Sequence, residues 1–220
     1  WLFVLSVVFL FLFKAHMKRT ESPFINIELF TNKPLLRLIA VGFIINVALC
    51  ASLLLLPLLL GREHGLSPFV IGIALFVASL FGIVSSFITG KIIPSFGNVK
   101  MMYVASVVMI IGFLILGIIP DGNLLFILFA VILTFMSYSA IQVSLNTFIP
   151  KTLNPAKVGV GLGLYNLINF FGMAFGPAVA SKIMESTNSY RLNFILLVIL
   201  ISAHFFLLMG MSSFQKKMEQ

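Results

Sequence analysis

Six uncharged polar side chains lie deep inside long apolar stretches of the sequence. They are Asn46, Tyr138, Gln142, Asn146, Asn166 and Asn169. In a helix, residues four apart share a face, which places Tyr138, Gln142 and Asn146 together, and the two asparagines near position 168 pair in the same way. Amide and phenol groups in apolar surroundings either join neighbouring helices by hydrogen bonds or contact a bound ligand. The spacing alone fits both roles.

The ionisable residues form no catalytic or metal-binding pattern. All six acids fall between or beyond the apolar stretches: Glu21, Glu28, Glu63, Asp121, Glu185 and Glu219. The three histidines, His16, His64 and His204, occupy separate segments and lack the spacing of a metal site. We therefore expect no enzyme activity, no metal and no other cofactor.

One histidine stands apart because it falls inside an apolar stretch. His204 is about twelve residues into the last one, and an unperturbed imidazole titrates near physiological pH, so a role in proton transfer fits its position. A neutral ring that shares a hydrogen bond with a neighbouring helix explains the position equally well.

The overall composition is that of a membrane protein. Of the 220 residues, 60% are hydrophobic and 9% are charged, and the mean hydropathy is +1.16. A soluble domain carries about 25% charged residues, so too little polar surface is present for a water-facing protein. The net charge of +8 does not indicate nucleic-acid binding, because the basic residues fall between the apolar stretches rather than along one face.

Six apolar stretches have the length of membrane-spanning helices. They run over 38–60, 69–89, 101–119, 124–149, 158–180 and 192–211, each 19 to 26 residues long. A helix of about 20 residues crosses the hydrocarbon core, and none of the stretches shows the alternation of a barrel strand. The predicted fold is an all-α membrane protein with a six-helix transmembrane bundle over 38–211.

The flanking segments complete the predicted organisation. An apolar run over 1–13 is too short to cross the membrane and is predicted to be the end of a truncated transmembrane helix. Residues 14–37 are predicted to form a linker that either lies on the inner membrane surface or is solvated, and residues 212–220 a tail.

The basic residues predict the orientation of the bundle. Eleven Lys and Arg residues fall before the first stretch, in every second loop and in the tail, whereas the alternate loops hold only Arg62, Lys182 and Arg191. Because basic residues accumulate on the cytoplasmic side, the eleven-residue side and the C-terminus are predicted to be cytoplasmic.

Two glycine patterns go beyond hydropathy. Gly163, Gly172, Gly176 and Pro177 lie in the fifth stretch, and their spacing resembles the antiporter motif of the major facilitator superfamily. Glycines at four-residue spacing also pack helices in other membrane bundles. In the turn expected between the second and third stretches, Gly90, Gly97 and Lys100 resemble a degraded copy of the cytoplasmic loop motif of that superfamily, with Pro94 in place of an acidic residue.

Two further segments narrow the resemblance. Residues 22–33 and 65–72, with Ser22-Pro23-Phe24-Ile25 and Gly65-Leu66-Ser67-Pro68, resemble the start of the second bundle in fourteen-helix drug:proton antiporters. The fourth stretch lacks the Arg that the N-terminal half of such proteins carries there. The chain thus resembles the C-terminal half of a tetracycline or multidrug exporter of Gram-positive bacteria.

The resemblance implies a function that this chain performs together with a second bundle. It implies a bacterial plasma-membrane antiporter that exchanges protons for small amphipathic drugs by alternating access, with an N-terminal six-helix bundle as partner. It also implies that the fourth and fifth stretches line the cavity and that the last is peripheral. His204 is therefore expected to take part in helix packing, and the residue for proton coupling is expected to lie in the other half. A metabolite or peptide transporter of the same superfamily, or a non-transporting membrane scaffold, remains the alternative.

Overall fold

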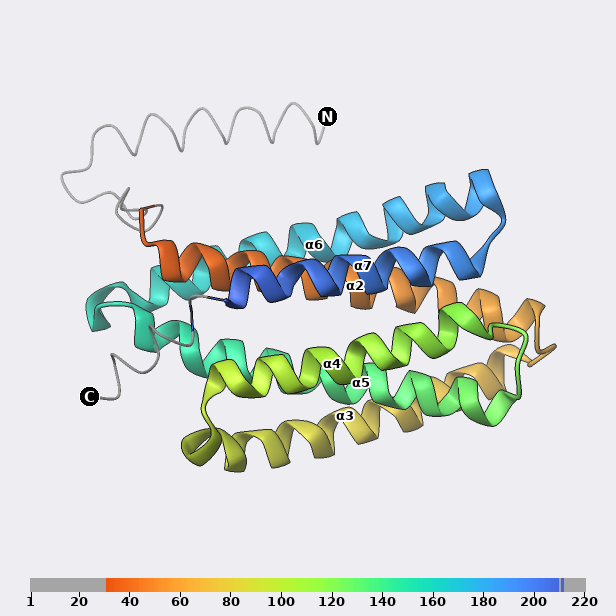
Figure 1. The fold of residues 1–220 in the computed structure, drawn as a ribbon, viewed down its shortest axis with the longest axis horizontal. Helices are drawn as coiled ribbons and strands as arrows, with labels where there is room; N and C mark the ends of the chain where they lie inside the picture. The colour runs from red at the N-terminus through yellow and green to blue at the C-terminus, as the bar shows by residue number, and fades with distance from the viewer. Residues whose placement is uncertain (1–30, 210, 212–220) are drawn as a thin grey trace.

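The computed structural model of the protein describes residues 31–209 and 211, and this part contains six long helices (Figure 1). They are α2 (Lys33–Arg62), α3 (Pro68–Phe96), α4 (Asn98–Ile118), α5 (Leu124–Phe148), α6 (Val158–Thr187) and α7 (Tyr190–Leu208). Each is long and apolar enough to cross a membrane. The predicted helical membrane fold is confirmed. The predicted truncated helix, most of the linker and the tail lie outside the described residues.

Local sequence signals fix where these helices begin. Asn32, Ser67, Asn123 and Ser189 each stand immediately before a helix, and each side-chain oxygen accepts a hydrogen bond from a backbone N–H of the first turn. Proline follows the cap within the first two helical positions of α2 and α3, where its missing N–H costs nothing. The four caps satisfy backbone donors that would otherwise be orphaned at the membrane surface.

The helices extend past the apolar stretches that predicted them. α2 begins at Lys33 rather than at Leu38, and α6 continues to Thr187 rather than ending at Ala180. Hydropathy detects the part of a helix that matches the hydrocarbon core, whereas backbone hydrogen bonds continue the helix into the polar region on either side.

The connection between α3 and α4 corrects the sequence prediction most clearly. The sequence predicts a turn from Gly90 to Lys100, but α3 runs through Gly90 and Pro94 to Phe96. Only Gly97 separates the two helices, with a φ of 92° that residues with side chains rarely adopt. One glycine therefore makes the reversal for which the sequence pattern predicts a longer loop.

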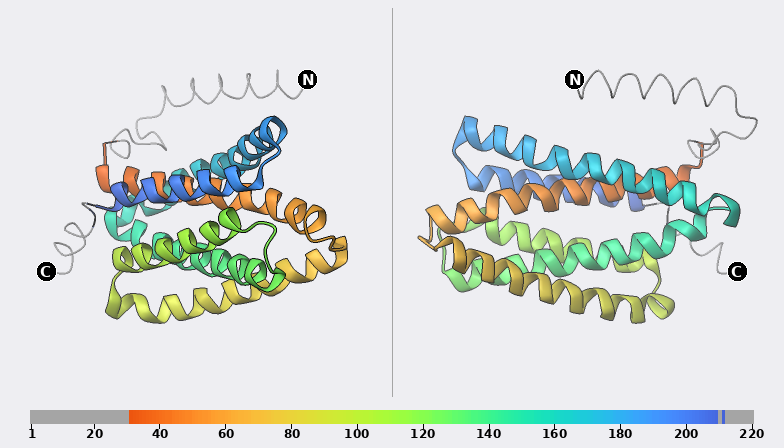
Figure 2. Two further views of the ribbon diagram at one scale, coloured as in Figure 1. Left: turned by 45° about the vertical axis from the view of Figure 1, so that its right-hand side comes forward. Right: turned by 180° about the vertical axis from the view of Figure 1, so that it is seen from behind.

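The six helices form two groups of three (Figure 1). α2 packs with α6 and α7, and α5 packs with α3 and α4; contacts between α4 and α7 and between α2 and α5 join the groups. The views in Figure 2 give the same grouping. α2 comes from the first three helices in the chain and α5 from the last three, so each group combines helices from both halves of the sequence. This exchange agrees with two three-helix repeats of inverted topology.

The two ends of the bundle differ in charge. At the end where α2 begins, the described residues include Lys33, Arg37, Lys91, Lys100, Lys151 and Lys157 and no acid. The opposite end has the three described acids, Glu63, Asp121 and Glu185, alongside Arg62, Lys182 and Arg191. We call these the basic end and the mixed end.

Candidate functional site

Four polar side chains from three helices are joined by hydrogen bonds in the interior of the bundle. Tyr138 Oη on α5 donates to Asn46 Oδ1 on α2 at 2.9 Å and accepts from Gln142 Nε2 at 2.8 Å. Tyr165 Oη on α6 donates to Gln142 Oε1 at 2.6 Å. We call Asn46, Tyr138, Gln142 and Tyr165 the polar cluster. It links α2, α5 and α6 through neutral groups only.

The helices hold this cluster in place through local geometry. Tyr138 and Gln142 are one turn apart on α5, so both face α2 and α6. Asn46 is fixed on its own helix, because its Nδ2 donates to the carbonyl of Gly42 at 2.8 Å. Asn46 and Tyr165 are almost fully buried, whereas Tyr138 and Gln142 keep part of their surface accessible. The accessible edge of the cluster therefore belongs to α5.

Gly42 allows α6 to approach α2 at the level of the cluster. A Cβ atom at this position would lie 2.5 Å from Tyr165 Cε2 and 2.7 Å from Asn169 Oδ1. Asn169 is 4% exposed, and its Oδ1 accepts no hydrogen bond from the described residues. A buried acceptor without a partner beside the cluster is a place where a donor from a ligand or water would gain a hydrogen bond.

The six polar residues of the sequence prediction are only partly brought together. Asn46, Tyr138 and Gln142 join the cluster, and Asn169 lies beside it. Asn146 is exposed and donates to the Gln142 carbonyl at 3.0 Å, and Asn166 on α6 is exposed as well. The two α6 asparagines differ in burial, because Asn169 lies against α2 at Gly42 whereas Asn166 lies at the uncovered edge of the same face.

Two residues of the site were missed as site residues by sequence reasoning. Tyr165 contributes the only described link from α6 into the cluster, and Gly42 provides the space for its ring. A tyrosine one turn before Asn169 was a usable signal for the first. A single glycine within an apolar stretch gives no signal of the residue it will meet.

The two halves of the glycine motif of α6 differ in how closely they approach α2. A Cβ at Gly172 would lie 2.8 Å from the Phe43 carbonyl oxygen, and one at Gly176 would collide with the Val47 carbonyl. Gly163 has open space around its Cα, so in the described residues it makes no such approach. Pro177, next to Gly176, lies inside α6, and the helix continues past it. Close packing against α2 therefore belongs to the second half of the motif.

The sequence of this chain is similar to those of known proteins. The sequence profile described as Major Facilitator Superfamily matches residues 1–177. The chain belongs to the major facilitator superfamily. Among its relatives, the MFS-type transporter YvkA of Bacillus subtilis is 25% identical over 211 residues, which cover 96% of this chain and 47% of YvkA. The quinolone resistance protein NorB of Staphylococcus aureus is 23% identical over 186 residues, covering 81% of this chain and 39% of NorB. The chain spans less than half the length of these relatives.

The loop pattern expected for this superfamily is partly helical here. Gly90 lies in α3 and has open space around it, and Gly97 makes the turn. Lys100 in the first turn of α4 has its Nζ 5.9 Å from the centre of the Phe96 ring, and Lys91 Nζ lies 4.3 Å from that of Phe87. Long cationic side chains that rest on aromatic rings at helix ends are typical of a membrane interface.

A group of hydrogen bonds at the basic end joins the start of α4 to the end of α5. Asn98 is 1% exposed and donates to the Ser144 carbonyl at 2.9 Å and to Thr147 Oγ1 at 2.6 Å. Lys151, in the short 3-10 helix η2 (Ile149–Thr152), donates to Asn98 Oδ1 at 3.3 Å. Together with η3 (Pro155–Lys157), η2 forms the connection to α6.

His204 connects α7 to α4 at a fully buried position. Its Nε2 lies 2.8 Å from Ser106 Oγ, and that hydroxyl donates to the Met102 carbonyl at 2.6 Å. Ser106 and His204 therefore share one hydrogen bond between α4 and α7. The contact is an interhelical hydrogen bond on α7, away from the polar cluster.

No metal-binding arrangement occurs in the part of the chain that the structure describes, since no three His, Cys, Asp or Glu side chains gather there. Cys50 is a free, half-buried thiol on α2. The neutral polar cluster is the candidate functional site of the described residues.

Proposed function

We propose that this chain forms the C-terminal half of an exporter of small amphipathic drugs, and that the polar cluster contacts the substrate. Membership of a transporter superfamily supports transport, and the relative named a quinolone resistance protein supports drugs as the substrates. The observation that carries the proposal is a neutral hydrogen-bonding cluster at the meeting point of α2, α5 and α6, with an accessible edge on α5.

The chemistry of the cluster supports amphipathic substrates rather than small charged ones. Amide and phenol groups offer hydrogen bonds without a fixed charge, and the apolar composition of α2, α5 and α6 offers dispersion contacts to an apolar substrate body. Asn169 Oδ1 adds a buried acceptor beside the cluster. A substrate with an apolar body and one or two hydrogen-bond donors matches this set.

We further propose a partner bundle and proton antiport. α3 and α6 are the least buried spans, so their outer faces are available to an N-terminal six-helix bundle. Among the described residues, carboxylates occur only at the mixed end, and proton coupling through an intramembrane acid would therefore be supplied by the partner bundle. Substrate would cross as the two bundles rock about the site between them.

The same proposal places the basic end in the cytoplasm of a bacterial cell, with the C-terminus inside. The charge difference between the two ends supports this orientation, since basic residues remain on the cytoplasmic side. Export then proceeds from the basic end toward the mixed end.

The test is a drug-susceptibility panel on cells that express the full-length gene. We expect reduced susceptibility to several amphipathic drugs, lost when the proton gradient is dissipated. Tyr138→Phe removes the hydroxyl that joins Asn46 and Gln142 and should reduce this protection. Tyr103→Phe is the matched control, because Tyr103 packs against Phe205 on the other side of the bundle. Unchanged susceptibility to every drug despite normal expression would refute the proposal, as would equal effects of the two substitutions.

A further inference from the structure

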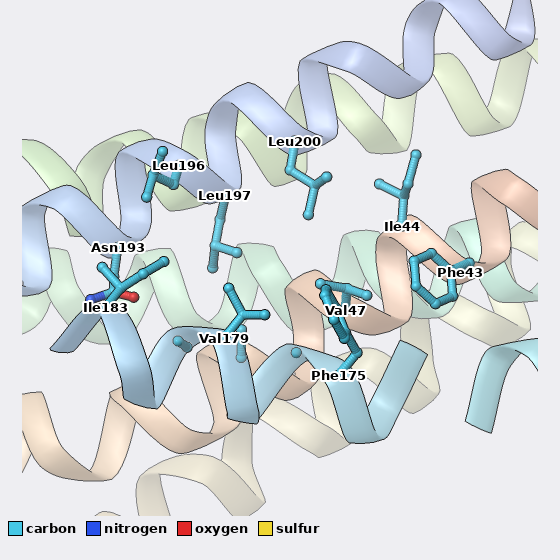
Figure 3. Close-up of a pocket in the computed structure, with 13 residues that line it drawn as sticks. Phe43, Ile44, Val47, Phe175, Val179, Ile183, Asn193, Leu196, Leu197 and Leu200 are labelled. Carbon is cyan, nitrogen blue, oxygen red and sulfur yellow. The ribbon is translucent and has the colours of Figure 1, made fainter. Parts of the chain in front are cut away.

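An apolar cavity of about 290 Å³ lies between α2, α6 and α7 (Figure 3). Leu196, Leu197 and Leu200 extend from α7 toward it, and Val179 points into it from α6. None of the four residues of the polar cluster lines this cavity. It is therefore a separate feature of the bundle.

The cavity has a long shape and a polar end. Figure 3 places Asn193 and Ile183 at one end and Phe43 at the other. The α7 residues that line it run from Asn193 to Leu200, a distance of about 10 Å at the rise of an α-helix. All other lining side chains are apolar, so Asn193 alone can select a polar group.

Asn193 has one hydrogen-bonding atom left for a ligand. It is 2% exposed, and its Nδ2 donates to the Ser189 carbonyl at 3.1 Å and points to Met184 Sδ at 4.0 Å. The Ser189 carbonyl and Met184 Sδ are both hydrogen-bond acceptors, so the Asn193 amide is oriented with its nitrogen toward them. Its Oδ1 accepts no hydrogen bond from any described residue. A carbonyl oxygen without a partner in an apolar cavity gains most from a ligand that donates to it.

The entrance to the cavity is apolar as well. α6 packs mainly on α2 and α7 on α4 and α2, so the two helices touch each other little, and the lining residues Val179 and Leu196 are each 37% exposed. A ligand entering there meets no charged side chain among the lining residues. This favours a molecule that partitions into the bilayer over one that arrives from water.

We infer that this cavity is a second binding site, for a lipid-soluble molecule with an unbranched apolar chain and one terminal hydroxyl or amide donor. The chain lies along Val179, Leu197 and Leu200, and the donor hydrogen bonds to Asn193 Oδ1. The site is independent of which drug the polar cluster takes, so it can be tested separately.

The experiment uses the purified full-length protein and a decanol that carries a photoreactive diazirine in its chain. After illumination, mass spectrometry should find the label on residues 175–183 of α6 and 193–200 of α7. Competition then compares 1-decanol with its isomer 1-methoxynonane, which keeps the oxygen and lacks the donor. One hydrogen bond corresponds to a preference of about fivefold for decanol. Label elsewhere, or equal competition by the two isomers, would overturn the inference.

Two variants assign the effect to the cavity. Asn193→Val should keep the labelling and bring the preference for decanol to about one. Val179→Trp should fill the cavity and abolish labelling, whereas Ile199→Trp, on the outward face of α7 at 59% exposure, should not. A preference that survives in Asn193→Val, or equal labelling of the two Trp variants, would contradict the proposed binding mode.

Discussion

Tyr138 on α5 donates a hydrogen bond to Asn46 on α2 from a position 92 residues later in the chain. Asn46 lies near the middle of the first helix of one three-helix repeat, and Tyr138 lies near the middle of the first helix of the other. Because α2 and α5 run in opposite directions, their middles are the positions at which equivalent residues meet. The Tyr138–Asn46 contact therefore lies where the two repeats face each other, near the middle of both helices.

Gly42→Ala should impair substrate binding by displacing Tyr165. The added Cβ would lie 2.5 Å from the tyrosine ring, so the hydrogen bond from Tyr165 to Gln142 should be lost. We expect KM for export to rise severalfold in vesicles while expression is kept. Gly72→Ala is the control, since nothing lies within 4 Å of the position that its new methyl group would take. Identical KM values for the two variants would contradict the role of Gly42.

Gly176→Leu should destabilise the bundle more than Gly163→Leu does. At Gly176 the new side chain meets the backbone of α2 at Val47, and overpacking of this kind costs about 1–3 kcal/mol or more. Gly163 faces open space in the described residues. Thermal unfolding of the two purified full-length variants measures the difference. Equal losses at both positions would show that packing is spread over the whole motif.

His204→Gln should retain export driven by a proton gradient. Glutamine keeps an amide N–H that can donate to Ser106 Oγ, and the contact with α4 needs only that hydrogen bond. Substrate uptake into inside-out vesicles with an imposed pH gradient is the measurement, and Ser106→Ala serves as the companion variant. Loss of gradient-driven uptake with intact counterflow exchange would place proton coupling in this half.

Cysteine labelling of intact cells should report the orientation. In a Cys50→Ser background, Asn154→Cys introduces an exposed thiol at the basic end and Glu63→Cys one at the mixed end. An impermeant thiol reagent should label the second and not the first, because the basic end is proposed to face the cytoplasm. The reverse pattern would invert the proposed direction of export.

The six spans and the difference in charge between the two ends could be predicted from the sequence. Each depends on a short stretch of chain, because about 20 apolar residues set a membrane span and the basic residues fall in the loops between spans. The same local reasoning proposed Asn46, Tyr138 and Gln142 as site residues, because polar groups inside apolar stretches must find partners.

Which faces of the helices meet depends on tertiary packing that the sequence pattern does not reveal. Membrane helices are apolar on most sides, so their sequences carry little of the polar and apolar contrast that orients helices in water. Nothing local distinguishes Asn169, beside the cluster, from the exposed Asn166, or Gly176, against Val47, from the open Gly163. These differences arise from close packing of α6 on α2, which brings together residues more than one hundred positions apart in the chain.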